Sequence, residues 1–321
     1  MFLSIAAFSS AMLGAVSQGI LWGVMALGVY ITFKILDFAD MTVDGSFALG
    51  GCTCAILITK GMNPLLALLI AFLIGTVAGL ITGILHTKLK IPGILAGILM
   101  MLALYSVNLR IMGGPNKPLS RSSVTVMSKI NEMLKLKDLF KDNANSISAL
   151  ITGVIFAIAL IVILYWFFGT EIGSAIRATG NNENMSRAQG VNTDTMKILA
   201  LMLANGLVSL SGALVMQQQR FGDVSMGIGA IVIGLASIII GEVVLGNRNR
   251  FWYSLLAVML GSVIYRLIIA IVLQLGMKSQ DMKLLTAVIV AASLSVPVLK
   301  KNFFPKNKGR KITRNTGNNG E

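Results

Sequence analysis

Few residues in this chain could act as catalytic groups or metal ligands. The sequence holds one histidine, His86, and two cysteines, Cys52 and Cys54, which lie together in an apolar run. A C-x-C pair with the histidine far along the chain is not a metal-binding set, and we expect both thiols to be small buried side chains. A single histidine also excludes a Ser/His/Asp site, and neither H-E-x-x-H nor G-x-x-x-x-G-K-[ST] occurs. The sequence therefore predicts no metal site, no cofactor and no ATP site in this chain, which is not an enzyme by itself.

Charged residues inside apolar segments suggest a different chemistry. Arg266 lies within the apolar run 252–274. A charge inside a bilayer is costly unless it is paired or hydrated. Arg266 could reach the membrane surface, pair with Asp223 or Asp281 as a structural strut, or line a transport path.

Two short polar segments match each other position by position. Phe38-Ala-Asp-Met-Thr-Val43 is similar to Phe221-Gly-Asp-Val-Ser-Met226, and each follows a long apolar segment and precedes a glycine-containing one. Paired interrupted segments of opposite orientation are typical of an inverted repeat. The residues that we predict along a substrate pathway are Asp40, Thr42, Phe221, Asp223 and Arg266.

The composition indicates which elements position these residues. Of 321 residues, 55% are hydrophobic and 12% are charged, and a soluble chain usually carries about 25% charged residues. The mean hydropathy is +0.80. Because a membrane span needs about 20 apolar residues, the sequence predicts an all-α integral membrane protein of roughly nine transmembrane helices. They are expected at 11–33, 45–59, 64–85, 92–109, 147–168, 196–217, 227–245, 252–274 and 284–299.

The spans divide the chain into two repeats that could be inverted. We expect the first repeat at 1–109, an extracytoplasmic segment at 110–146, a connecting helix at 147–168, a cytoplasmic loop at 169–195, the second repeat at 196–299 and a basic tail at 300–321. The extracytoplasmic segment has apolar residues at helical spacing from Met127 to Phe140. This amphipathic helix either packs against the bundle or forms a docking platform for a partner.

The net charge of +14 comes largely from segments that we place on the cytoplasmic side. The tail from Lys300 to Arg314 is rich in lysine and arginine, which favours an anionic membrane surface over a nucleic acid as its partner. Because cytoplasmic loops carry an excess of these residues, the N-terminus is predicted outside and the C-terminus inside.

The longest polar stretch on the cytoplasmic side is 169–197. Its first part predicts a short helix ended by Gly180, and Asn181 or Asn182 can cap a second helix that ends at Gly190. Asn192 or Thr193 then caps the next long helix. Two capped helices predict a rigid connection.

The same loop, Glu171-Ile-Gly-Ser-Ala-Ile-Arg-Ala-Thr-Gly-Asn-Asn-Glu-Asn-Met-Ser-Arg-Ala-Gln-Gly-Val191, resembles the cytoplasmic loop of branched-chain amino acid and ribose type ABC permeases. Asp40-Met-Thr-Val-Asp-Gly-Ser46 is similar to that family's D-L-S-x-G-S segment, with Asp44 as an extra residue. The segment 227–241 is similar to a later A-x-x-x-G-G segment. The resemblance spans about 11–299. Compared with many sugar-type members, this sequence shows no extra N-terminal span.

This resemblance implies a BtuC-like, type II-like ABC importer permease that forms a dimer, either a homodimer or a heterodimer, works by alternating access and binds no ATP itself. It implies three partners: a cytoplasmic ATP-binding cassette subunit, an extracytoplasmic substrate-binding protein and a second permease copy. Residues of the loop expected to couple to the ATPase are Arg177, Gly180, Asn181 and Asn184. An amino acid, branched-chain or aromatic, is the expected substrate. A sugar or nucleoside is the alternative, followed by secondary transport, for which no carboxylate lies at the centre of a predicted span.

Overall fold

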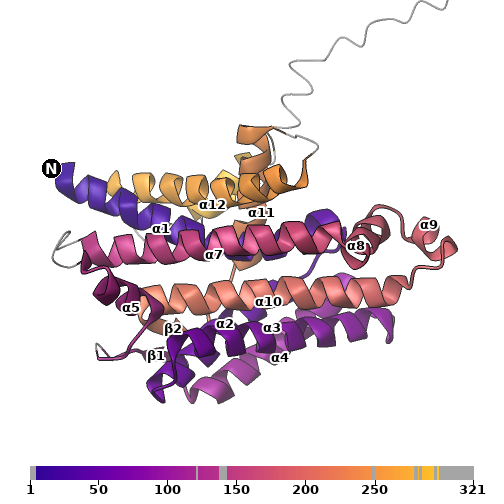
Figure 1. Ribbon diagram of the computed structural model, residues 1–321, viewed down its shortest axis with the longest axis horizontal. Coiled ribbons are helices and arrows are strands. Elements are labelled where there is room, and N and C mark those ends of the chain that lie inside the picture. Colours follow the sequence, from indigo (N-terminus) through magenta and orange to yellow (C-terminus); the bar gives the residue numbers. More distant parts are fainter. Residues whose placement is uncertain are drawn as a thin grey trace, which may run out of the picture.

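The computed structural model describes residues 5–120, 122–136, 143–246, 250–277, 281, 284–292 and 295. Most of these residues are helical, and the long helices run along one common axis (Figure 1). In chain order the elements are α1 (Ile5–Tyr30), the π-helix η1 (Ile31–Ile35), α2 (Thr42–Thr59), α3 (Pro64–Thr87), α4 (Gly93–Met112), β1 (Asn116–Pro118), α5 (Val126–Met133), α7 (Ala144–Gly169), α8 (Glu171–Asn181), α9 (Glu183–Ala188), α10 (Thr193–Gln219), β2 (Phe221–Asp223), α11 (Ala230–Leu245) and α12 (Phe251–Gln274).

Among the described residues, 7 helices are long and apolar enough to cross a membrane. They correspond to the spans predicted at 11–33, 45–59, 64–85, 92–109, 147–168, 196–217 and 252–274. The span predicted at 227–245 begins later, because 224–229 form turns, and α11 has 16 residues. For the span predicted at 284–299, the structure describes helix over 284–292, and most of the remainder lies outside the described residues.

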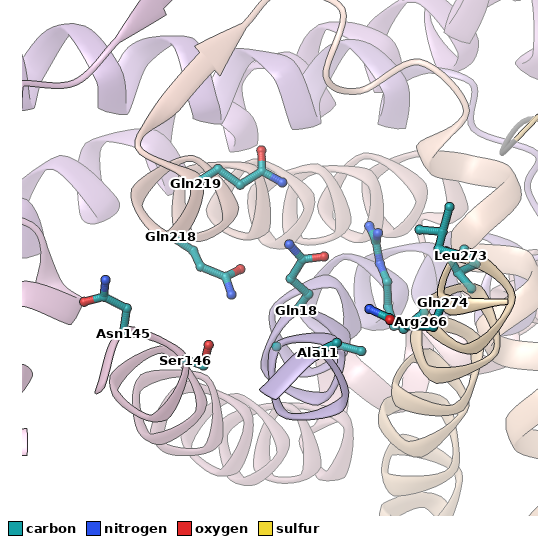
Figure 2. A pocket seen from close by; sticks show the side chains of 13 residues that line it. Ala11, Gln18, Asn145, Ser146, Gln218, Gln219, Arg266, Leu273 and Gln274 are labelled. Atoms are coloured by element: carbon teal, nitrogen blue, oxygen red, sulfur yellow. The ribbon is translucent and has the colours of Figure 1, made fainter. Parts of the chain in front are cut away.

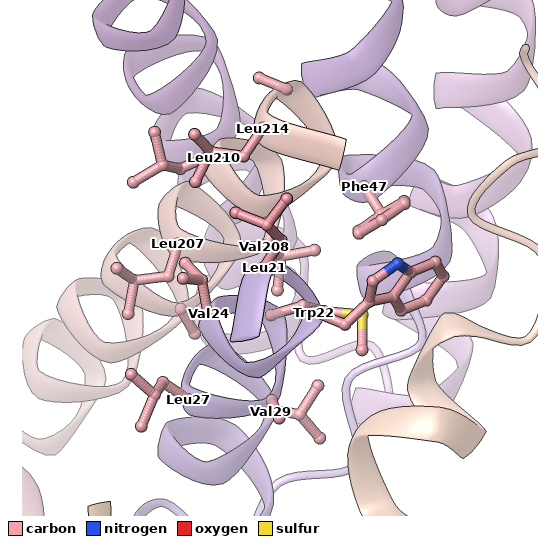
Figure 3. Packing of buried hydrophobic residues seen from close by; sticks show 14 of the residues in the cluster. Leu21, Trp22, Val24, Leu27, Val29, Phe47, Leu207, Val208, Leu210 and Leu214 are labelled. Carbon is pink, nitrogen blue, oxygen red and sulfur yellow. The ribbon is translucent and has the colours of Figure 1, made fainter. Parts of the chain in front are cut away.

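Helices α10 and α2 form the centre of the bundle. Helix α10 packs most extensively against α3, α2 and α1, and α1 packs in turn on α12. Figure 3 shows the contact between α1 and α10, where Leu21, Val24 and Leu27 lie against leucine and valine side chains of α10. These side chains are almost fully removed from solvent, so the core lies where α1, α2 and α10 meet.

Glycine lets the central helices approach at backbone distance. A Cβ atom at Gly212 of α10 would collide with the carbonyl oxygen of Phe47 in α2, and one at Gly79 of α3 would collide with the carbonyl oxygen of Leu201 in α10. Small residues at such contacts are typical of helix packing in lipid. The glycine-rich composition therefore serves the packing of α2, α3 and α10.

The face of α3 that points away from α10 shows the opposite pattern. Helix α3 presents a row of exposed apolar side chains spaced four residues apart, at Leu65, Leu69, Leu73, Val77 and Ile81. Residues at this spacing share one helix face. In a membrane this face is suited to contact lipid or another protein.

The two ends of the bundle carry different small elements. Helices α8 and α9 lie at one end, and α5, the β-strands and the first residues of α1 lie at the other (Figure 1). Strands β1 and β2 are antiparallel, with Asn116 opposite Asp223, a pairing that the sequence did not suggest. The amphipathic helix expected from Met127 to Phe140 is shorter in the structure, because α5 ends at Met133 and 134–135 form a turn. Helix α5 packs on α7, and 137–142 lie outside the described residues.

Candidate functional site

The most buried polar cluster joins the start of α2 to the middle of α10. Asp40 is 1% exposed, and its carboxylate accepts hydrogen bonds from Asn205 Nδ2 at 2.7 Å and from the backbone N–H of Thr42 at 2.9 Å. Ser46 donates to Asn205 Oδ1 at 2.7 Å, and the hydroxyls of Thr42 and Thr82 lie 2.9 Å apart. Asp40 and Thr42, both predicted along a pathway, thus belong to a closed hydrogen-bond network between three helices. A buried polar network whose members are paired rigidifies a core.

The second polar turn has the same local form in a different setting. Asp223 Oδ1 accepts from the backbone N–H and the hydroxyl of Ser225, as Asp40 accepts from Thr42. Aspartate that bonds the backbone two residues later forms a turn without help from other elements. Asp223 lies in β2, and Phe221 in the same strand is 40% exposed. These two predicted pathway residues therefore lie in the hairpin, at the end of the bundle opposite α8.

Asp44, the extra residue in the first polar segment, connects the two segments. Its carboxylate oxygens accept from the backbone N–H groups of Gly229 at 2.8 Å and Ile231 at 3.0 Å, at the beginning of α11. A carboxylate at this position satisfies free N–H groups and interacts favourably with the helix dipole. Gly227, which stands at the matching position, packs its backbone on the carbonyl oxygen of Asp44.

Arg266 lines a cavity of about 460 Å³ between α1, α7, α10 and α12. Its guanidinium carbon lies 4.1 Å from the centroid of the Trp22 ring, and Trp22 in turn lies 4.7 Å from the ring of Phe47. Among the described residues, neither Asp223 nor Asp281 forms an ion pair with it, so the strut interpretation is wrong for this structure. Arg266 Nε is buried without a hydrogen-bond partner.

Figure 2 shows the amide side chains that surround this cavity. Gln18 and Arg266 extend from α1 and α12 toward α10, and Gln218 extends from α10 into the same space. The remaining residues that line the cavity are small or apolar, apart from Asn145, Ser146, Gln219 and Gln274. Of the five predicted pathway residues, Arg266 is the one that lines this polar space.

At the opposite end, α8 and α9 form the two capped helices that the sequence predicts. Thr170 Oγ1 accepts from the N–H of Gly173, Asn182 Oδ1 from Met185 and Asn192 Oδ1 from Thr195. The cap of α9 is therefore Asn182, whereas Asn181 is the last residue of α8 and is exposed. Asn184 is exposed on α9, whose last turn is followed by Gly190 at φ +84°.

Gly180 has another role than the helix-ending one expected for it. It lies inside α8, and a Cβ atom there would collide with the carbonyl oxygen of Ile35 in η1. The absence of a side chain lets α8 pack directly on this π-helix. Lys34 of the π-helix also forms an ion pair of 2.9 Å with Glu242 of α11. Single π-helical turns occur often at functional sites. Helix α8 thereby touches the segment that leads to Asp40.

The other residue of α8 expected to face a partner is Arg177. Its guanidinium carbon lies 5.1 Å from the centroid of the Phe251 ring at the start of α12. The side chain is exposed and lines a surface depression with Trp166 and Trp252. Arg177 therefore contacts the bundle through its planar group while remaining accessible.

Glu183 fastens α9 to the beginning of α10. Its carboxylate lies 2.7 Å from Lys197 Nζ and 2.8 Å from Arg187, which also donates to Thr193 at 2.8 Å. The hydrogen bond from Lys197 holds the pKa of Glu183 below its ordinary value. The side-chain caps and this charged cluster together make α8 and α9 a rigid projection.

Sequence reasoning missed Asn205, Ser46 and Glu183 as members of these clusters. Asn205 had a usable signal, because it is an amide in the middle of the apolar segment 196–217. Such residues are usually paired across helices. Glu183 carried no comparable signal, since its partner Lys197 lies fourteen residues later, beyond a glycine turn.

Comparison with known proteins places this arrangement in context. Residues 11–293 match the family described as branched-chain amino acid transport system / permease component. The tyrosine transport system permease protein of Clostridioides difficile (strain R20291) is 42% identical over 89% of this chain and 91% of that protein. The ribose import permease protein RbsC of Escherichia coli (strain K12) is 24% identical over 74% of this chain and 71% of its own length. A probable branched-chain amino acid permease, LivH of Methanocaldococcus jannaschii, is 25% identical over 82% of this chain and 87% of its length.

Proposed function

Because the chain belongs to the permease component family of branched-chain amino acid transport systems, we propose that it carries an amino acid with an aromatic side chain across the membrane. It is the membrane-spanning permease subunit of an ABC-type importer. The family relationship supports a binding protein that delivers the solute, a separate ATPase that supplies the energy, and a second permease copy.

The observation that carries the proposal is the projection formed by α8 and α9. It is held by three side-chain caps and the Glu183 cluster, and it still presents Arg177, Asn181 and Asn184 to its surroundings. A loop that transmits force must be rigid and must contact an element that moves. Gly180 brings α8 against η1, which leads directly to the buried turn at Asp40, and this contact supports η1 as that element.

Orientation follows from this assignment. An ATPase that docks on α8 and α9 places this end of the bundle in the cytoplasm, and the end with α5 and the hairpin outside. The substrate class is supported by the high identity to a tyrosine permease and by the polar cavity at the outer end. Alternating access then requires that the ATPase contact α8 differently in two states.

A docking test uses bulky substitutions at exposed positions. Asn184→Trp should abolish co-purification of the ATPase and reduce uptake of the amino acid, because a large ring at the contact prevents close approach. Ser122→Trp, exposed at the opposite end, is the matched control and should leave the ATPase bound. Retention of the ATPase by Asn184→Trp combined with Asn181→Trp would sink the assignment of α8 and α9 as the docking element.

Orientation can be measured with single thiols, since Cys52 and Cys54 are both buried. In intact cells a membrane-impermeant maleimide should label Ser122→Cys and should label Asn184→Cys only after the membrane is opened. The reverse pattern would overturn the proposed orientation. Uptake of labelled tyrosine, with leucine and ribose as competitors, tests the substrate: competition by ribose but not by leucine would favour the sugar alternative.

A further inference from the structure

The cavity around Arg266 holds an unpaired donor and an unpaired acceptor. Arg266 Nε has no hydrogen-bond partner, and neither has the buried carbonyl oxygen Oε1 of Gln218, whose Nε2 donates to Ser17 at 3.3 Å. Buried polar groups are nearly always paired, so each such atom requires an explanation. The two residues that carry them, one a donor and one an acceptor, both line one cavity.

The charge of Arg266 has no protein counterion among the described residues. The five salt bridges among the described residues all involve other side chains, so no carboxylate among them pairs with Arg266. The ring of Trp22 at 4.1 Å compensates part of the cost of burying the charge. A planar guanidinium with free donors is well suited to bind a carboxylate.

The cavity has room for a small molecule and an apolar wall to hold its body. Its volume of about 460 Å³ lies within the range of ligand sites in proteins. Small residues of α1, Ala11, Gly14 and Ala15, leave the space open, while Ile269 and Leu273 of α12 provide apolar surface. A second cavity of about 560 Å³ under α5 shares Asn145 and Gln218 with the first. The two spaces meet at the end of the bundle that carries α5 and the hairpin.

We propose that Arg266 and Gln218 form a binding site for the zwitterionic end of an α-amino acid, with Arg266 holding the carboxylate and Gln218 Oε1 accepting from the ammonium group. This inference rests on the proposed function and adds the place where the solute is first held within the permease. An anionic lipid headgroup such as that of phosphatidylglycerol shares the oxyanion chemistry but has no ammonium group to donate to Gln218 Oε1.

Trp22 provides a direct reporter of this site. The chain has 3 tryptophans, and Trp166 and Trp252 both line the depression near Arg177. In the assembled transporter in nanodiscs, with Trp166→Phe and Trp252→Phe, the emission of Trp22 should change saturably when L-tyrosine binds, because the guanidinium over its ring changes partner. Tyramine, which lacks the carboxylate, and hydroxyphenylpropionate, which lacks the ammonium group, should each bind at least about tenfold more weakly.

Variants separate the two contacts. Arg266→Gln should abolish the Trp22 response to tyrosine and raise the KM for uptake about tenfold or more, with a smaller effect for Arg266→Lys. Arg110→Gln, an exposed arginine on α4, is the control and should behave as wild type. If Arg266→Gln does not fold, Gln218→Leu still tests the proposal, because it should remove the preference for tyrosine over hydroxyphenylpropionate.

The outcomes also separate this site from the proposed function. Normal tyrosine uptake with no Trp22 response, or with an unchanged KM in Arg266→Gln, would overturn the site and leave the function standing. A Trp22 response to phosphatidylglycerol but not to tyrosine would likewise overturn it in favour of a lipid. Saturable binding of tyrosine without uptake by the assembled transporter would support the site and contradict the proposed function.

Discussion

The two halves of the chain use the same aspartate turn in different ways. In the first half, Asp40 is buried against the middle of α10 and joined through Asn205 to Ser46, and α2 begins two residues later. In the second half, Asp223 bonds Ser225, lies in a β-strand at the end of the bundle opposite α8 and is followed by turns before α11 begins at Ala230. One local motif is therefore part of the core in one half of the chain and part of the surface in the other.

This difference indicates that the two polar turns serve different roles. The buried turn connects α2, α3 and α10 and follows η1, the element that Gly180 contacts. The exposed turn follows Arg220, which lines the polar cavity under α5. We infer that the end near α8 transmits movement and that the opposite end binds. Substitutions at the two ends should therefore differ in kind as well as in size.

The largest effect is expected when the two aspartates are compared directly. Asp40→Ala removes the acceptor of one hydrogen bond from Asn205 Nδ2 and of the bond from the N–H of Thr42, while Asn205 keeps its bonds to Leu201 and Ser46. The loss of these two buried bonds should destabilise the protein by about 3 kcal/mol. Asp223→Ala removes bonds in a partly exposed turn and should cost about 1 kcal/mol or less. Thermal unfolding of the purified protein measures both. Similar losses of Tm for the two variants would remove the distinction between a core turn and a surface turn.

A functional effect should follow from the contact between α8 and η1. Gly180→Ala places a methyl group against the carbonyl oxygen of Ile35, and such overpacking costs about 1–3 kcal/mol. Because α8 must then move away from η1, we expect uptake to fall about tenfold while ATP hydrolysis by the assembled transporter continues. Gly169→Ala is the control, since no atom lies within 4 Å of its Cβ position. An unchanged ratio of uptake to ATP hydrolysis in Gly180→Ala would show that force does not pass through this contact.

Much of this fold could be predicted from the sequence, because its strongest signals are local. Apolar segments of sufficient length predicted the seven long helices, and Asn192 and Gly190 correctly marked helix ends. The apolar segment 227–245 gave a shorter helix because its first residues form turns capped by Asp44, a contact between residues 185 positions apart. Contacts of this kind have no local signature.

The candidate site was harder to predict from the sequence for the same reason. Aspartate and threonine in a polar segment were natural pathway candidates, yet the partners that enclose them come from α10 and α3. Gly180 was expected to end a helix, since glycine does so often, and instead it provides space for Ile35. The position of Arg266 in its helix was evident, but its cavity depends on small residues of α1.

A moderate effect should come from the residue that links the two halves. Asp44→Asn keeps one acceptor for the N–H groups of α11 but removes the charge at its N-terminus, which should cost about 0.5–1 kcal/mol. Asp37→Asn is a suitable control, because Asp37 is exposed at φ +54°, where asparagine is well tolerated. Hydrogen exchange in α11 should increase in Asp44→Asn alone. Equal protection of α11 in both variants would mean that Asp44 does not hold the beginning of this helix.

The smallest effect concerns the pH dependence of the end near α8. The hydrogen bond from Lys197 lowers the pKa of Glu183 from its ordinary value of 4.5, so the contribution of this group is complete above that value. It is lost as the pH falls through the lowered pKa, because protonation releases Lys197 and Arg187 from the carboxylate. For a partly exposed cluster we expect about 1 kcal/mol or less. Hydrogen-exchange protection factors of α9 should therefore decline in acid for the wild type and stay flat for Glu183→Gln, and parallel declines in the two proteins would show that another group at this end titrates.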